Sequence, residues 1–175
     1  VSWLAYEGRL HSHADASLRA IAGKAPGLAL VPVEHLGNSS HSEEEVDKVI
    51  ELTTELSGMV GEDEVLIVAP YNAQVDSIRD ALDAAGFNRV QVGTVDKFQG
   101  REAMAVIISL AASSAEDAPR GLEFLLDRNR MNVALSRAKT NSYLVYSPAL
   151  IRSRFTSVED VKAVSRLAGL LEFAI

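Results

Sequence analysis

Short apolar runs alternate with stretches of helical periodicity along most of this chain. Within each run the hydrophobic residues are nearly continuous, which indicates strands that are buried on both faces of a parallel sheet. Helices between such strands form right-handed βαβ units, so the pattern predicts an α/β fold with an open, mostly parallel sheet and helices on both faces. The expected strands are residues 28–33, 65–70, 90–95, 105–111 and 142–146.

Two helices are expected in the first half of the chain. Ser42 and Glu45 form a capping-box pattern ahead of an apolar stripe that continues to Leu56. Asn72 can cap the next helix, whose stripe continues until Gly86. Residues 1–27 are the least regular part of the chain, with only a weak helical pattern over residues 16–22.

Three further helices are expected in the second half. Ser114 and Asp117 can cap a helix that continues to Leu126. An apolar stripe over residues 131–138 predicts another helix ahead of the last strand, and residues 158–173 form a final amphipathic pattern. The chain of 175 residues is long enough to bury the core of one ordinary domain.

Composition restricts the function classes. The net charge of -7 argues against a domain whose whole surface binds nucleic acid, although it leaves room for a local basic patch. The absence of cysteine excludes disulfides and thiolate metal sites and favours the reducing cytoplasm. No apolar run approaches the roughly 18 residues of a membrane span, so no membrane association is expected.

The stretch VGTVDKFQGREAMAVIISL contains polar residues between two expected strands. Thr94 and Asp96 follow one strand, where their side chains can hold a phosphate or a sugar hydroxyl. Gly100 permits a close approach of the backbone, and Glu102 offers a carboxylate to a ribose. A turn that is polar for purely structural reasons explains this stretch equally well.

The stretch APYNAQ places an aromatic residue and an amide at another strand end. Ligands of open parallel sheets bind outside the carboxyl ends of strands, which makes Tyr71 and Asn72 candidate contacts. Taken alone, the simpler interpretation is that Asn72 caps a helix and that Tyr71 is an exposed residue at its rim.

The stretch RMNVALSRAK carries two arginines seven residues apart, which a continuous helix would place on nearly the same side. Arg130 and Arg137 would then present two aligned guanidinium groups to an anionic partner. The alternative is a solvated helix face with surface ion pairs to Asp127 or Glu123.

In their order and spacing these stretches resemble the fourth-to-sixth motif region of superfamily I DNA/RNA helicases. The matching segments are VLIVAPYNAQ, VGTVDKFQGREAMAVIIS and RMNVALSRAKTNSYLV, and they are similar to the nonsense-mediated-decay and replication-maturation helicase branch. The segment AEDAPRGLEFL and the helical tail resemble bacterial proteins that join a RecB-like nuclease to such a helicase. The chain departs from the family at Ala105, near a position that is often acidic, and at Lys139, where arginine is commoner.

The resemblance implies the RecA-like fold of P-loop NTPases, as the second of two motor domains. It assigns residues 28–150 to this domain and residues 151–175 to a helical tail that packs on it. Residues 1–27 would lead in from an N-terminal part outside this chain, which begins with Val1 and not with methionine. The segment YEGRLHSH would follow the first arginine-bearing motif of the family.

The resemblance also implies the roles of individual residues. Arg137 would be the catalytic arginine finger and would bind ATP together with Gly100 and Glu102. Gln99 would couple the ATP site to the nucleic-acid site. The residues expected to face the sugar-phosphate backbone are Pro70, Tyr71, Asn72, Thr94 and Asp96.

ATP and Mg²⁺ are the ligands expected of the full-length enzyme, and this chain alone is expected to hold neither. The P-loop pattern G-x-x-x-x-G-K-[ST] and an acidic Mg-binding pair are absent from the sequence. His11 and His13 have an H-x-H spacing, but no further ligands of suitable spacing follow, so no metal site is expected.

The implied partners are single-stranded nucleic acid, with DNA favoured over RNA, and the N-terminal RecA-like domain of the same polypeptide. The sequence leaves open whether a RecB-like nuclease domain is fused to the same polypeptide. The alternative from another class is a noncatalytic, doubly wound module that binds a nucleotide or a partner and hydrolyses nothing.

Overall fold

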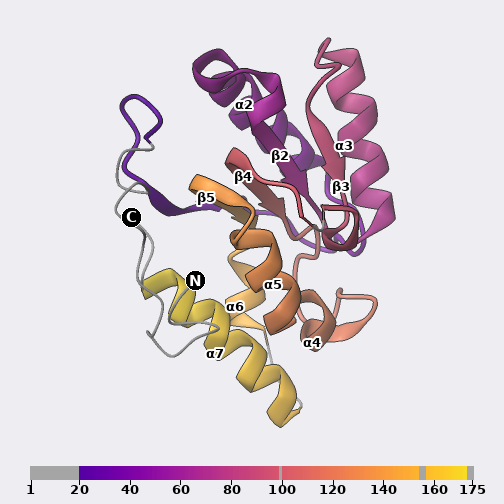
Figure 1. The fold of residues 1–175 in the computed structure, drawn as a ribbon. Helices are drawn as coiled ribbons and strands as arrows, with labels where there is room; N and C mark the ends of the chain where they lie inside the picture. Colours follow the sequence, from indigo (N-terminus) through magenta and orange to yellow (C-terminus); the bar gives the residue numbers. More distant parts are fainter. Residues whose placement is uncertain (1–19, 99, 154–156, 173–175) are drawn as a thin grey trace.

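The fold is a parallel sheet between two layers of helices (Figure 1). The computed structural model describes residues 20–98, 100–153 and 157–172. Within these residues five strands form one sheet in the order β1-β5-β4-β2-β3, and all neighbouring strands are parallel. The strands are β1 (Gly27–Pro32), β2 (Val65–Val68), β3 (Gln91–Gly93), β4 (Ala103–Ser109) and β5 (Ala138–Tyr146). The predicted α/β class and parallel sheet are confirmed.

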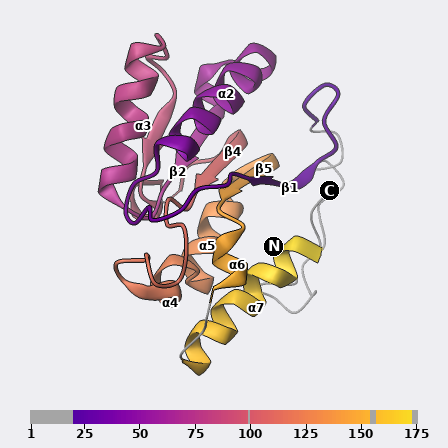
Figure 2. The same cartoon turned by 180° about the vertical axis from the view of Figure 1, so that it is seen from behind.

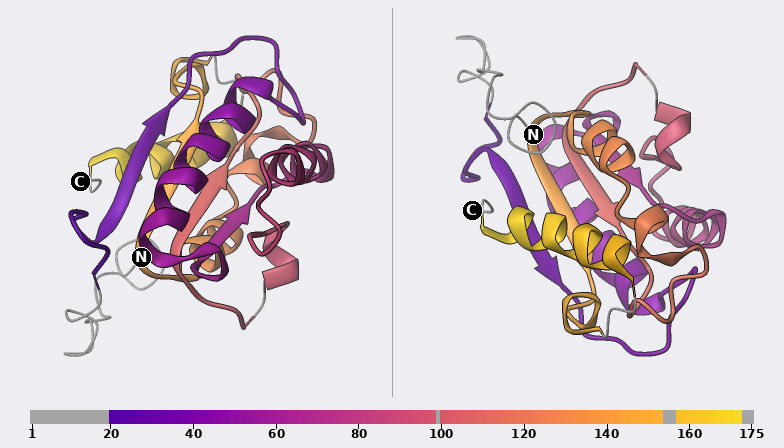
Figure 3. Two further views of the ribbon diagram at one scale, coloured as in Figure 1. Left: turned by 90° about the horizontal axis from the view of Figure 1, so that it is seen from above. Right: turned by 90° about the horizontal axis from the view of Figure 1, so that it is seen from below.

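Helices cover both faces of the sheet, as Figures 2 and 3 show. On one face lie α2 (Glu43–Val60) and α3 (Asn72–Ala84). On the other face lie α4 (Gly121–Leu125), α5 (Arg128–Leu135), α6 (Ala149–Arg152) and α7 (Val158–Glu172). Two short 3₁₀ turns, Glu62–Glu64 and Val95–Phe98, precede β2 and follow β3.

The continuous hydrophobicity of the strands reflects burial on both faces. In β2, Val65 and Ile67 pack into the core under α2 and α3, whereas Leu66 and Val68 pack into the core on the opposite face. Successive side chains of a strand point to opposite faces, so a strand between two helical layers needs apolar residues at every position.

The first helix is capped as predicted, and the second is not. The Ser42 hydroxyl accepts a hydrogen bond from the Glu45 N–H at 3.2 Å, which confirms the cap of α2. The prediction that Asn72 caps α3 is wrong. Tyr71 occupies the cap position without a side-chain hydrogen bond, and Asn72 is already the first helical residue.

The segment after β4 forms a turn before it forms a helix. The Ser114 hydroxyl donates to Asp117 at 2.6 Å and accepts from the Asp117 N–H at 3.2 Å. This pair therefore closes a turn, and the expected helix starts only at Gly121. The weak helix expected over residues 16–22 is not formed by residues 20–22, and its earlier part lies outside the described residues.

The helix predicted over residues 131–138 ends at Leu135, and β5 begins at Ala138 instead of residue 142. Ala138 pairs with Ala103 of β4, so sheet formation ends the helix that the apolar stripe favoured. Because Arg137 lies in the turn between α5 and β5, the prediction that Arg130 and Arg137 share one helix face is wrong.

The last helix shares the core of the sheet. Val164, Leu167 and Leu170 of α7 are buried in the same hydrophobic cluster as Leu122 of α4 and Leu144 of β5. No helix among the described residues is long and apolar enough to cross a membrane.

Candidate functional site

A groove opens at the carboxyl edge of the sheet. The turn after β2 and the turn after β3 meet there because the two strands are parallel neighbours. The groove has a volume of about 370 Å³. It is lined by Pro70, Tyr71, Asn72, Thr94, Asp96, Arg120, Phe124 and Arg130, so it brings together every residue that we expected to face nucleic acid.

Gly93 sets the course of the turn that carries Thr94 and Asp96. A β-carbon at Gly93 would lie 2.5 Å from the Lys97 side chain and 3.2 Å from the Phe98 ring, which is fully buried. Only glycine therefore lets the 3₁₀ turn fold back against the end of β3. The Thr94 carbonyl accepts a hydrogen bond from the Lys97 N–H at 3.0 Å, which holds the turn in this position.

Tyr71 is buried, and its expected exposure at a helix rim is wrong. The side chain packs beside Phe124, with ring centroids 5.9 Å apart. Its hydroxyl has no hydrogen-bond partner among the described residues, and burial raises the pKa of Tyr71. Most of the ring is thus out of reach of a ligand, and Tyr71 forms the wall of the groove.

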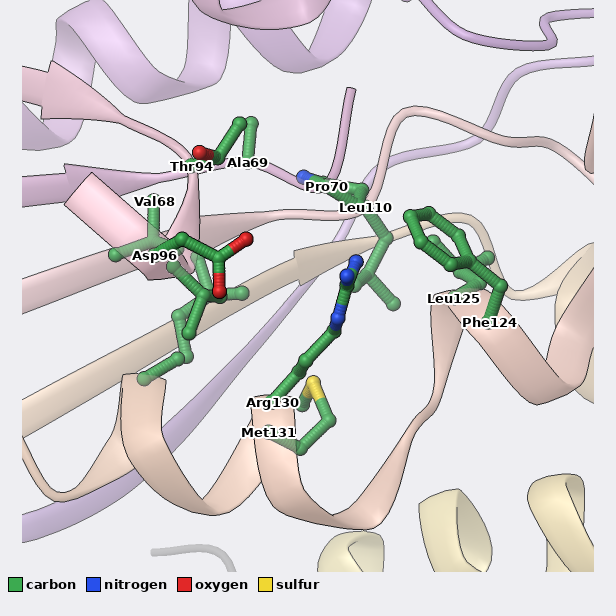
Figure 4. Close-up of a pocket in the computed structure, with 13 residues that line it drawn as sticks. Val68, Ala69, Pro70, Thr94, Asp96, Leu110, Phe124, Leu125, Arg130 and Met131 are labelled. Carbon is green, nitrogen blue, oxygen red and sulfur yellow. The ribbon is translucent and has the colours of Figure 1, made fainter. Parts of the chain in front are cut away.

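Arg120, Phe124 and Arg130 line the groove beside Tyr71, and of these three only Arg130 is a candidate from the sequence. The guanidinium carbon of Arg120 lies 3.7 Å from the Phe124 ring centroid, and that of Arg130 lies 4.3 Å from it. Figure 4 shows the Arg130 side chain rising from α5 between Asp96 and Phe124. Beneath this layer the groove continues into an apolar pocket lined in part by Leu110 and Met131.

Gly100, Glu102 and Arg137 lie at the amino edge of the sheet. Glu102 directly precedes β4 and Arg137 directly precedes β5, and these strands are parallel neighbours. The Arg137 carbonyl accepts from the Ala103 N–H at 3.0 Å, which fixes the two segments together. Gly100 has a φ of +84° and open space around it, so its backbone is accessible.

The Arg137 guanidinium is held by neutral acceptors. It donates to the carbonyl of Val133 at 3.2 Å, to the carbonyl of Arg101 at 3.3 Å and to the hydroxyl of Ser136 at 3.1 Å. No carboxylate lies within 4 Å of this group in the described part of the chain. Its positive charge is therefore oriented without being neutralised.

The remaining family positions have structural roles or lie outside the described residues. Lys139 pairs with Glu64 at 3.0 Å and lowers the pKa of that carboxyl, which ties the start of β5 to the turn before β2. Ala105 is fully buried in β4. Gln99 is not among the described residues, so its coupling role stays a prediction.

A buried polar network connects the helices α2 and α3 to the carboxyl end of β4. Of this network, only the capping box of Ser42 and Glu45 is evident from the sequence. Glu45 accepts from the Ser109 hydroxyl at 2.6 Å and from the Ala111 N–H at 3.0 Å. The His35 ring lies 3.1 Å from the other Glu45 oxygen, and Gln74 donates to Ser109 at 2.9 Å. The network thus joins α2 and α3 to the end of β4.

No cluster of three or more histidine, aspartate or glutamate side chains suited to a metal ion exists among the described residues. The polar groups of the two edges are guanidinium groups, carboxylates, a hydroxyl and accessible backbone, which are kinds of group that contact phosphates and sugars in nucleic-acid-binding proteins.

Several known proteins with similar sequences are helicases by name. The chain is 32% identical over 128 residues to "Putative helicase mov-10-B.1" of Danio rerio, a match to 62% of this chain and 13% of that protein. This chain is also 35% identical over 146 residues to "DNA replication ATP-dependent helicase/nuclease DNA2" of Gallus gallus, and the match covers 81% of this chain and 14% of that protein. The chain therefore spans only about a seventh of these relatives.

A relative from Methanocaldococcus jannaschii is likewise a helicase by name. The chain is 32% identical over 124 residues to "Uncharacterized ATP-dependent helicase MJ0104" of Methanocaldococcus jannaschii, with 71% of this chain and 17% of that protein covered. The family model described as "AAA domain" matches residues 2–148. With its parallel sheet and this match, the chain belongs to the AAA domain family, as a C-terminal domain of the superfamily I helicase type.

Proposed function

We propose that this chain is the second motor domain of an ATP-dependent helicase. In this proposal the carboxyl edge of the sheet grips single-stranded nucleic acid through Pro70, Asn72, Thr94 and Asp96, and Tyr71 contributes only the small exposed part of its buried ring. The amino edge completes an ATP site, through Gly100, Glu102 and Arg137. The observation that carries the proposal is the separation of these two residue sets onto opposite edges of one sheet.

The proposed reaction is attack of water on the γ-phosphate of ATP bound between this domain and an N-terminal RecA-like domain. Arg137 stabilises the charge that develops on the phosphoryl group, and Gly100 and Glu102 contact the ribose side of the nucleotide. Mg²⁺ would be held by the other domain, where it would supply neutralisation of phosphate charge. Neutral anchoring of the Arg137 guanidinium supports this role, because a preformed salt bridge would have to break first.

The connection between the edges suggests how the two ligands are coupled. Thr94 follows β3 and Glu102 precedes β4, so a single short segment that contains Gln99 runs from the nucleic-acid groove to the nucleotide side. Closure of the interdomain cleft on ATP would then shift the groove, and repeated cycles would step the domain along the strand. Residues 28–150 form the motor domain in this proposal, and residues 151–175 form its tail.

Substitutions at the two ends of this segment test the proposal in the full-length protein. We expect Thr94→Ala to weaken single-strand binding and the strand-stimulated ATPase rate while basal hydrolysis persists. We expect Glu102→Ala to raise the ATP concentration for half-maximal rate, with single-strand affinity in the absence of nucleotide unchanged. Fluorescence anisotropy with a labelled oligothymidylate, beside ATPase titrations, measures both properties.

A matched control is Thr54→Ala, an exposed threonine in α2 whose hydroxyl bonds only to its own helix. It should change neither property. If Thr94→Ala and Glu102→Ala lose both functions together and also melt at lower temperature, the segment is a structural turn and the two-edge proposal fails. Comparison of DNA and RNA oligonucleotides tests the preference for DNA.

A further inference from the structure

We infer that Arg120 and Arg130, stacked on Phe124, form a clamp for a backbone phosphate of the single-stranded nucleic acid. This arginine clamp rests on the proposed function. It adds phosphate recognition by two arginines to which the helicase resemblance gives no role. Both guanidinium groups line the same carboxyl-edge groove as Thr94 and Asp96.

The first argument is the unbalanced charge of the clamp. No carboxylate lies within 4 Å of either guanidinium group in the described residues, although the chain as a whole carries a net charge of -7. Each group lies within 4.3 Å of the same ring centroid. Two like charges held this close to one aromatic ring repel each other, and an anion that accepts hydrogen bonds from both groups reduces that repulsion.

The second argument concerns orientation. The Phe124 ring holds two planar forks at the wall of the groove, and such forks bind phosphate oxygens through paired hydrogen bonds. Because guanidinium groups occupy the space over the ring, a base can stack on Phe124 only by displacing one of them. The clamp therefore suits the phosphate of a nucleotide and not its base.

The third argument is the place of Asp96. This carboxylate is exposed at the same groove and forms no ion pair within 4 Å among the described side chains. It repels a phosphate, so the phosphate is directed toward the arginine wall, while the carboxylate can accept a hydrogen bond from a base or a sugar. The groove thus distinguishes the charged and uncharged parts of one strand.

The test measures the salt dependence of oligonucleotide binding by the full-length protein. Each phosphate contact to a single strand contributes about 0.7 to the slope of log affinity against log salt concentration. We expect Arg120→Ala and Arg130→Ala each to weaken binding of a labelled oligothymidylate by about tenfold at low salt. The double variant should also reduce the slope by about 0.7 for one shared phosphate.

Two further variants separate charge from packing. Phe124→Leu keeps both cations and most of the apolar volume, so affinity should fall while the salt slope is kept. Arg89→Ala is the control, because it removes one positive charge that is paired with Asp63 at 3.0 Å outside the groove. It should change neither quantity. Thermal melting verifies that each variant is folded. If Arg130→Ala does not fold, Arg130→Gln is used in its place.

Three outcomes overturn the clamp. An unchanged slope in the double variant, with Thr94→Ala still weakening binding, would contradict the clamp and leave the proposed function standing. If every variant, Thr94→Ala included, binds the oligonucleotide as tightly as the unsubstituted protein, the proposed function itself is contradicted. Equal competition by a polyglutamate peptide, with the same sensitivity to Arg120→Ala, would identify the groove as a site for acidic protein segments.

Discussion

Arg137 is anchored by neutral groups, which makes its charge available to a ligand. In the full-length protein we expect Arg137→Ala to lower the ATPase rate by about 10³-fold while ATP binding is affected less, because an arginine finger acts mainly on transition-state charge. Arg137→Lys should rescue poorly, since an ammonium cannot reproduce the planar fork. Steady-state ATPase assays measure the rate, and an unchanged rate in Arg137→Ala would identify Arg137 as a surface residue.

Gly93 is a second position where one side chain has a large expected effect. Gly93→Ala places a β-carbon against Lys97, which can move, and against the buried Phe98 ring, which cannot. We expect a loss of about 1–3 kcal/mol in the free energy of unfolding, together with weaker strand binding because the Thr94 turn is displaced. Chemical denaturation and anisotropy measure the two effects. Gly58→Ala, in open space within α2, is the control and should not destabilise.

The candidate residues differ in how far the sequence could identify them. Thr94, Glu102 and Arg137 could be selected because their motifs match a known order and spacing. Arg120 and Phe124 could not, because their importance depends on how α4 places them against Arg130 of a different helix. Tyr71 was assigned the wrong environment for the same reason, since Phe124 packs beside its ring.

At the scale of elements, periodicity predicted the type of most helices and strands but not where they end. The strands were recognised because burial on two faces requires continuous apolar residues. The end of α5 was misplaced because Ala138 suits both a helix and a strand, and its pairing with Ala103 decides between them. Competition of this kind is tertiary, so a local pattern contains no signal for it.

Glu45 connects the start of α2 to the end of β4, so a substitution that removes its hydrogen bonds should lower the free energy of unfolding. In Glu45→Gln one oxygen can still accept from Ser109 and Ala111, but an NH2 group replaces the other oxygen, which lies 3.1 Å from the His35 ring, so the buried network loses an acceptor. We expect a cost of about 1–3 kcal/mol in unfolding free energy. Glu44→Gln, one residue earlier and exposed, is the matched control and should cost less. Equal effects of the two substitutions in thermal melting would show that the buried network contributes nothing.

For the molecule as a whole, the parallel sheet explains how one domain could serve the two ligands that we propose. All strands point the same way, so residues that follow strands and residues that precede them are collected at opposite edges. The groove with Thr94 and the segment with Arg137 are therefore separated by the length of the strands, yet both are fixed to the same rigid core. Movement of the whole domain would then change both proposed sites together, as the proposed motor function requires.

The same architecture makes a firm prediction for this chain in isolation. Phosphoryl transfer depends almost entirely on positioning and on electrostatic stabilisation, and an arginine finger without a P-loop and Mg²⁺ ligands provides only part of that. The sequence of this chain contains no G-x-x-x-x-G-K-[ST] pattern. We therefore expect the purified chain to release phosphate from ATP at the background rate, with or without single-stranded DNA.

The control for that experiment is the same chain with Arg137→Ala, which should give an identical background rate. Turnover that persists in Arg137→Ala would come from a contaminating ATPase and not from this domain. Turnover that is present in the chain and lost in Arg137→Ala would contradict the prediction that this chain supplies only part of the ATP site, because the chain would then contain a complete catalytic site. Binding of the oligothymidylate by the isolated chain, measured in parallel, would show that the carboxyl-edge groove works without the partner domain while hydrolysis does not.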